Sequence, residues 1–174
     1  FNVVGDLTVN SKSIVPVLSV RATSSLARNS DTTLNADPIL QFEAVANSSY
    51  HVEIYLLFYC GNTGVDCRLG FSGPTSSAFF AEGVSMASGS AANTIQRCGF
   101  TGSHFAVSTN GGADVYNNVI DIAGSTSSQL IKISMDVRIQ GTAGTVSLDW
   151  GQGTSNGTNL NRNFGSFMKV DKVG

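Results

Sequence analysis

The chain has 174 residues, of which 13% are charged, and its formal net charge at pH 7 is −2. With 10 basic against 12 acidic residues scattered along it, the sequence lacks the basic surface that a phosphate backbone attracts, so we expect no nucleic-acid partner. Glycine occurs 19 times, and Ser, Thr and Asn are abundant, which favours strands and turns over long exposed helices. No apolar run approaches the roughly 20 residues that cross a bilayer, so we expect no membrane insertion.

The N-terminal segment predicts a connector rather than a folded unit. The chain starts without a methionine, and FNVVGDLTVN lacks the basic and apolar regions of a secretion signal, so we expect a processed chain or part of a longer one. Residues 14–21, IVPVLSVR, include Pro16, which cannot donate a ladder hydrogen bond and therefore favours an edge strand or an extended leader. We accordingly expect an extended leader at 1–20 and one folded domain at 21–174.

The first half of the domain predicts a loop, a strand and a hairpin. DTTLNADP, residues 31–38, is rich in turn residues and leads into a strand. YHVEIYLLFY, residues 50–59, alternates apolar and polar side chains until its far end becomes apolar on both faces. After the GNTGVD turn, CRLGF at 67–71 is expected to return as the antiparallel partner of 50–59. Residues 81–103 have a weak apolar signal and predict a long excursion or a short irregular helix.

The second half contains the clearest strand signals. QLIKISMDVRIQ, residues 129–140, alternates strictly between a core face and a solvent face. TVSLDW, residues 145–150, places the chain's one tryptophan, Trp150, on the same side as Val146 and Leu148, so we favour core packing for it over a sugar-stacking surface. About eight short strands with glycine-rich turns predict an all-β fold, an antiparallel, jelly-roll-like β-sandwich.

The three cysteines match no zinc-binding spacing, since Cys60 and Cys67 are separated by six residues and Cys98 stands alone. Cys60 and Cys67 bracket the GNTGVD turn, so a cross-strand disulfide is possible in an oxidising medium. We favour the alternative, in which these side chains are buried or half-buried thiols.

The sequence assigns no catalytic residue. Its two histidines are His51, on the polar face of a predicted strand, and His104, in a segment between a turn and a strand. No serine lies in a G-x-S-x-G motif or any other triad signature. The 12 acidic residues permit many carboxylate pairs, but none stands out as a glycosidase pair, so we expect a non-enzymatic protein.

No metal, cofactor or binding residue is assigned either. The segment DVYNNVID offers oxygen ligands for calcium but lacks the glycine and the final glutamate of a calcium loop, so an Asn-rich turn is favoured; its ligand candidates are Asp114, Asn117, Asn118 and Asp121. Tyr116 beside two of these asparagines, or the loop Gln152–Asn163, has the aromatic and amide groups of a glycan site. The same residues are also typical of ordinary turns.

Several pieces in a fixed order resemble a known family. They are GDLTVN at 5–10, DTTLNADPILQFEAVANSSY at 31–50, the segment containing Asp66 and GFSGP, and GTVSLDWGQGTSN at 144–156. Together they resemble a β-sandwich domain of tailed-bacteriophage virion proteins of the tail-fibre, minor-tail or structural type, over about residues 5–173. The chain departs from the family pattern at Gly151, where alanine usually stands between an aromatic residue and glutamine, and in its three cysteines.

The resemblance implies a non-enzymatic structural module on the surface of a virion, such as a fibre or decoration domain. It also implies a homotrimer or another multivalent assembly, with capsid or tail proteins as partners. The alternative is a receptor- or glycan-binding tip of a tail fibre that attaches to the host surface. Both possibilities place the protein on the extracellular phage particle.

Overall fold

The computed structural model describes residues 18–87, 94–101, 107–108, 120–122 and 126–174 and the short strands at 7–9 and 12–14, with side chains described at 18–81, 122 and 126–174. Within these residues all fifteen regular elements are β-strands, and all their pairings are antiparallel. The predicted all-β antiparallel fold is confirmed, with more strands than the sequence indicated. A jelly-roll arrangement of those strands stays a prediction.

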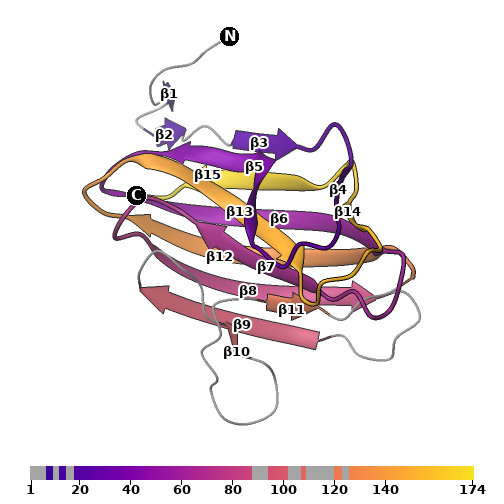
Figure 1. The fold of residues 1–174 in the computed structure, drawn as a ribbon. Coiled ribbons are helices and arrows are strands. Elements are labelled where there is room, and N and C mark those ends of the chain that lie inside the picture. The colour runs from indigo at the N-terminus through magenta and orange to yellow at the C-terminus, as the bar shows by residue number, and fades with distance from the viewer. Residues whose placement is uncertain are drawn as a thin grey trace.

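The larger sheet is built around the longest strand, β6 (Ser48–Cys60), as Figure 1 shows. On one side β6 pairs with all 11 residues of β12 (Gln129–Ile139). On the other side β15 (Phe167–Lys172) and β14 (Leu160–Arg162) pair with successive parts of it. The remaining strands of this nine-stranded sheet are β3 (Leu18–Arg21), β4 (Leu26–Arg28), β8 (Ala78–Ala87), β9 (Thr94–Thr101) and β10 (Val107–Ser108).

The smaller sheet has four strands in the order β11-β7-β13-β5. Their bounds are Asn35–Ala44 for β5, Cys67–Ser72 for β7, Ile120–Ile122 for β11 and Gly144–Gln152 for β13. In Figure 1 this sheet lies against one face of the larger sheet. A separate two-stranded sheet pairs β1 (Leu7–Val9) with β2 (Lys12–Ile14).

The hydrophobic core lies between the two sheets, because alternate side chains of each strand point inward. In β6 and β12, Ile54 and Ile133 face each other across the ladder, and both are 0% exposed. Burying one such side chain stabilises the fold by about 1.5–3 kcal/mol. The inward faces predicted for 50–59, 129–140 and 145–150 are confirmed.

The predicted hairpin of 50–59 with 67–71 is wrong. β6 and β7 belong to different sheets: β6 pairs with β12, β14 and β15, whereas β7 pairs with β11 and β13. The connecting residues carry the chain from one sheet to the other, with Val65 0% exposed and the Asp66 carbonyl accepting the Gly153 N–H at 2.7 Å. Alternation specifies which face of a strand is buried, but both a hairpin and a crossover satisfy it.

The absence of this hairpin also bears on the predictions made for Cys60 and Cys67. Cys60 and Cys67 are 1% and 0% exposed, so their predicted burial is confirmed. They end and begin strands of different sheets, so the hairpin that suggested a cross-strand disulfide is absent. Cys98 lies in β9, and its side chain is outside the described residues.

The excursion or helix predicted for 81–103 is also wrong where the structure describes it. β8 and β9 pair through eight successive positions, from Ala78 opposite Thr101 to Ser85 opposite Thr94. The other edge of β8 pairs with β12. Ladder hydrogen bonds on both sides hold β8 extended although its small side chains give a weak strand signal.

β3 forms an edge of the larger sheet, because among the described strands it pairs only with β15. Of the two alternatives for residues 14–21, an edge strand or an extended leader, Leu18–Arg21 forms the edge strand, whereas Pro16 lies outside the described residues. β3 spans the proposed boundary between leader and domain, and that division of the chain stays a prediction. The described residues contain no helix that is long and apolar enough to cross a membrane.

Candidate functional surfaces

The strand β5 is interrupted where proline occurs in it. Gln41 pairs with Ser147 and Ala36 with Asp149, so four residues of β5 face one residue of β13. Pro38 has no N–H, and the N–H groups of Ile39 and Leu40 instead donate to Asp37 Oδ1 at 2.9 and 3.0 Å. The strand thus begins within the segment predicted as a loop, and its irregularity turns the Asp37 carboxylate toward the core.

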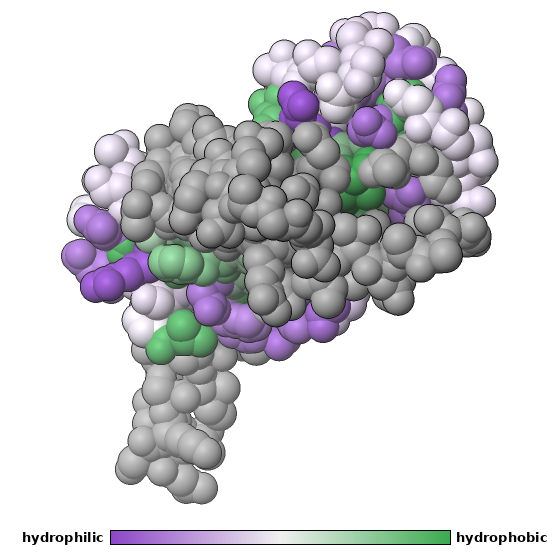
Figure 2. Space-filling view, turned by 90° about the horizontal axis from the view of Figure 1, so that it is seen from below, coloured by the Kyte–Doolittle hydropathy of each residue, from purple (hydrophilic) through white to green (hydrophobic). Residues whose placement is uncertain are grey.

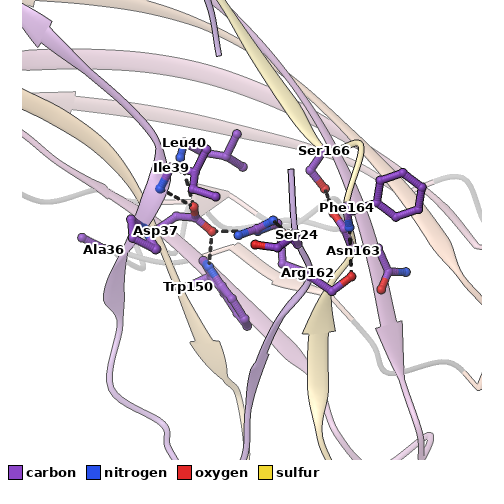
Figure 3. A network of polar contacts seen from close by, with 12 residues as sticks. Ser24, Ala36, Asp37, Ile39, Leu40, Trp150, Arg162, Asn163, Phe164 and Ser166 are labelled. Carbon is purple, nitrogen blue, oxygen red and sulfur yellow. Dashed lines mark hydrogen bonds and ion pairs between the residues drawn. The ribbon is translucent and has the colours of Figure 1, made fainter. Parts of the chain in front are cut away.

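Asp37 is the centre of a buried network, shown in Figure 3. Its second oxygen, Oδ2, accepts hydrogen bonds from Trp150 Nε1 at 3.0 Å and from Arg162 Nε at 2.9 Å. All three residues are 0% exposed. Arg162 Nη1 also donates to the carbonyl of Ser24 at 2.6 Å. Because Asp37 lies in β5 and Arg162 in β14, this ion pair connects the two sheets.

The network keeps the carboxylate ionised despite its burial. Burial by itself raises the pKa of Asp37, since a charge loses its hydration. The hydrogen bonds and the nearby guanidinium outweigh that effect and hold the pKa of Asp37 below its ordinary value of 3.8; they come from the N–H groups of Leu40 and Ile39, from Trp150 and from Arg162. Asp37 is therefore an anion at neutral pH with both oxygens engaged, so it performs structural work rather than proton transfer.

Trp150 is enclosed on all sides. The guanidinium of Arg28 lies 4.1 Å from the centroid of its ring, and Phe58 meets it edge-on at a centroid distance of 5.4 Å. Arg28 also donates to the carbonyls of Trp150, Asn35 and Ala36. Core packing of Trp150 is confirmed, and a sugar-stacking role is wrong for this buried indole.

Three loops meet at one end of the sandwich, and we call residues 29–34, 61–66 and 153–159 the loop platform. Backbone hydrogen bonds join them: Ser30 N–H donates to the Asn156 carbonyl at 2.8 Å, and Gln152 N–H to the Asp31 carbonyl at 2.9 Å. The hydrogen bond from the Gly153 N–H to the Asp66 carbonyl joins the loop 61–66 to the loop 153–159. These hydrogen bonds therefore connect the three loops to one another and to the end of β13.

Gln152 fixes this platform from below rather than contacting a ligand. It is 0% exposed, its Nε2 donates to the Thr158 carbonyl at 2.7 Å, and its Oε1 accepts from the Asn156 N–H at 3.0 Å. In the segment Gln152–Asn163, predicted as a candidate glycan site, Gln152 is therefore buried and only some of the other residues are exposed to a ligand. Thr154, Ser155 and Asn159 are its exposed polar members.

A polar groove lies at the opposite end of the sandwich. The turns 45–47 and 140–143 are joined by a hydrogen bond from the Asn47 N–H to the Gln140 carbonyl at 2.8 Å. Beside them is a groove of about 540 Å³, which we call the end groove; it is lined by Asn47, Ser48, Ser49, Arg138, Ile139, Gln140 and Gly141. Sequence reasoning missed this groove, although an arginine on the solvent face at the end of a strand was visible.

The His51–Asp136 pair and a hydrogen-bonded serine cluster lie on opposite sides of the core. His51 Nδ1 lies 2.8 Å from Asp136 Oδ1 on the solvent face of the larger sheet. A hydrogen-bonded cluster of Ser72, Ser147 and Asp149 lies instead on the outward side of the smaller sheet. The core separates the two groups, so this serine cluster is out of reach of His51.

The other sequence candidates fall outside the described side chains. These are His104, Asp114, Tyr116, Asn117, Asn118 and Asp121; the backbone of the last lies in β11. In the part of the chain with described side chains, no group of three or more His, Cys, Asp or Glu residues could hold a metal ion.

The described surface is mostly polar, with scattered apolar residues. In Figure 2 purple and pale residues dominate the coloured area, and green is confined to small patches. The large exposed hydrophobic residues come from separate elements; they are Leu18, Val45, Tyr59, Phe80, Phe164 and Val173. Single exposed apolar residues are ordinary at protein surfaces.

No protein-family model and no curated protein matches the sequence. Among solved structures, the chain is similar to the VP2 subviral particle of infectious bursal disease virus, with 10% identity, a TM-score of 0.31 and coverage of 92% of this chain and 41% of that one. The Gx strain of the same virus gives 12% identity, a TM-score of 0.22 and coverage of 97% and 43%. This chain thus spans less than half of either protein, and TM-scores this low do not establish a common fold.

Proposed function

We propose that this chain is a non-enzymatic structural module on the surface of a tailed-phage particle, serving as a fibre or decoration domain. The observation that carries the proposal is the role of the segment GTVSLDWGQGTSN, one of the pieces whose order carries the family resemblance. Trp150 from this segment completes the buried network with Asp37 and Arg162, and Gln152 fixes the loop platform. The segment therefore builds a rigid sandwich rather than a reaction site.

A homotrimer suits the central part of the larger sheet's solvent face, between the end groove and the loop platform. This part carries both signs of charge, in the pairs Lys132 with Glu53 at 3.6 Å and Lys169 with Asp171 at 2.8 Å. Exposed pairs contribute only about 0–1 kcal/mol to folding. Their larger effect is on association, because a surface with both signs of charge can pair its positive groups with the negative groups of another copy. Identical subunits around a symmetry axis make such self-complementary contacts.

Light scattering coupled to size exclusion tests the trimer. We expect a mass three times the 18.2 kDa of one chain, unchanged over a range of protein concentrations. A mass of one chain at high concentration would contradict the trimer.

The second candidate function is a receptor- or glycan-binding tip, favoured by the loop platform. A loop surface held in place before binding loses little conformational entropy when a ligand binds. We expect the isolated domain to bind host cells in this case, and to lose binding when Thr154, Ser155 and Asn159 are all changed to alanine. Release of reducing sugar from the host envelope would contradict a non-enzymatic role in either form.

A further inference from the structure

The end groove is a preformed concave site with fixed walls. Asn47 adopts a left-handed backbone conformation, with φ of 56°, and its N–H bond to Gln140 holds two turns side by side. The groove's volume of about 540 Å³ lies within the range of roughly 300–1,000 Å³ that is usual for small-molecule sites. It therefore has room for one or two sugar rings.

The groove contains a cation with no partner in the described part of the chain. Arg138 is exposed and lies opposite Ser49 on the solvent face, and it makes no ion pair with a described residue. The acidic side chains described on this face are engaged elsewhere; Asp136 contacts His51, Glu53 contacts Lys132 and Asp171 contacts Lys169. The last residue, Gly174, also lies beside Ser49, its carbonyl accepting the Ser49 N–H at 2.6 Å, and no ion pair within 4 Å joins it to Arg138. A guanidinium that is not neutralised by its neighbours favours an anionic ligand, and its planar donors match a carboxylate.

The neighbouring groups favour a ligand with hydroxyls rather than a bare anion. The amides of Asn47 and Gln140 and the hydroxyl of Ser49 line the same groove and both donate and accept hydrogen bonds. Phe80, which is 54% exposed, lies opposite Asp136 and so sits diagonally across the ladder from Arg138 on the same face. An exposed ring at about 7–8 Å along that diagonal can pack against the C–H face of a second sugar ring.

We propose that the end groove binds an acidic saccharide, with its carboxylate on Arg138 and its hydroxyls on Asn47, Gln140 and Ser49. A second sugar ring extends toward Phe80. This inference rests on the receptor-binding form of the proposed function, to which it adds a second recognition surface: the end groove, at the opposite end of the sandwich from the loop platform, with an acidic saccharide as its ligand.

Titration of the ¹⁵N-labelled protein with D-glucuronate and with D-glucose tests the proposal, because the two sugars differ only at the carboxylate. We expect glucuronate to shift the backbone amide signals of Ser49, Gln140 and Gly141 and to bind about tenfold more tightly than glucose, as a charge-assisted contact predicts. Equal binding of the two sugars, or shifts confined to other residues, would overturn it. Inorganic phosphate serves as a third probe, and binding of phosphate at this groove without binding of glucuronate would overturn it as well.

Two variants separate the groove from general surface charge. Arg138→Gln should weaken glucuronate binding about tenfold. Lys132→Gln removes the same charge from the same strand outside the groove and should leave the affinity unchanged. Both side chains face solvent, and matching urea unfolding curves would show that both variants fold. Equal losses in the two variants would overturn the assignment to Arg138.

Phe80→Ser tests the second sugar ring. We expect it to weaken a tetrasaccharide of alternating glucuronate and N-acetylglucosamine several-fold while leaving glucuronate itself unaffected. An unchanged tetrasaccharide affinity would overturn the role of Phe80. The oligomeric mass and the location on virions are measured separately. If the protein is a trimer on the virion but binds no glucuronate in the end groove, this inference is refuted and the proposed structural function still stands.

Discussion

The buried ion pair between Asp37 and Arg162 joins the two sheets. Replacing Asp37 with asparagine preserves its shape but leaves the Arg162 charge buried without compensation. Such a loss costs about 3–5 kcal/mol of the free energy of unfolding. We expect that decrease for Asp37→Asn in urea unfolding followed by the fluorescence of Trp150.

Asp171→Asn is the matched control, because Asp171 pairs with Lys169 at the surface, where their side chains are 27% and 41% exposed. It should cost at most about 1 kcal/mol. Equal losses in the two variants would mean that the buried pair contributes no more than a surface pair.

The same carboxylate predicts how stability depends on acid. The pKa of Asp37 is lower in the folded protein than its ordinary value of 3.8, so the unfolded chain takes up the proton first as the pH falls. Its contribution is complete well above 3.8 and is lost as the pH falls through the lowered pKa. We expect the free energy of unfolding to fall less steeply below about pH 4 in Asp37→Asn than in the unmodified protein. Identical acid dependence in both would contradict this role.

Sequence patterns predicted one member of this network and could not predict its partners. The burial of Trp150 follows from Val146 and Leu148 on the same face of its strand. Its acceptor, Asp37, is 113 residues away, and Arg162 is 125 residues from Asp37. No local pattern marks an arginine within an Asn-rich segment as buried, because its burial depends on a carboxylate that only the folded sandwich brings near.

At the scale of elements, alternation predicted the faces of strands but not their neighbours. The inward side chains of β6, β12 and β13 were correctly predicted, because a period of two identifies a half-buried strand. The partner of β7 was not, since the short turn after Cys60 suits a hairpin as well as a crossover. Pro38 likewise indicated a loop, whereas Asp37 satisfies the free N–H groups and lets the strand continue through it.

Gly151 shows how closely one strand approaches the loop platform. A Cβ on Gly151 would lie 2.5 Å from the backbone oxygen of Thr33, a contact that only movement of the loop can relieve. This contact accounts for glycine at this position. Gly151→Ala should therefore lower the free energy of unfolding by about 1–3 kcal/mol.

Gly157→Ala provides the comparison within the same platform, because nothing lies within 4 Å of a Cβ placed there. We expect a change within about 0.5 kcal/mol. Thermal unfolding of the two variants in parallel measures the difference, and a Gly151→Ala protein as stable as Gly157→Ala would refute the close approach.

At the scale of the whole molecule, the sandwich separates two surfaces. The loop platform and the end groove lie at opposite ends of the same strands, and the buried network holds the sheets between them. The all-β sandwich was predictable because several segments alternate with a period of two and none has a helical period. The order of the strands was not, because it depends on contacts between segments far apart in the sequence.

The central claim is that this sandwich is a structural module on the surface of a phage particle. Electron microscopy of purified virions labelled with gold-tagged antibody against the domain tests it most directly. We predict gold at fixed positions on the particle: label over the capsid would identify a head fibre or decoration domain, and label at the tail end would favour host attachment. Intact virions without label, with the protein found only in the unassembled fraction of the lysate, would contradict the account.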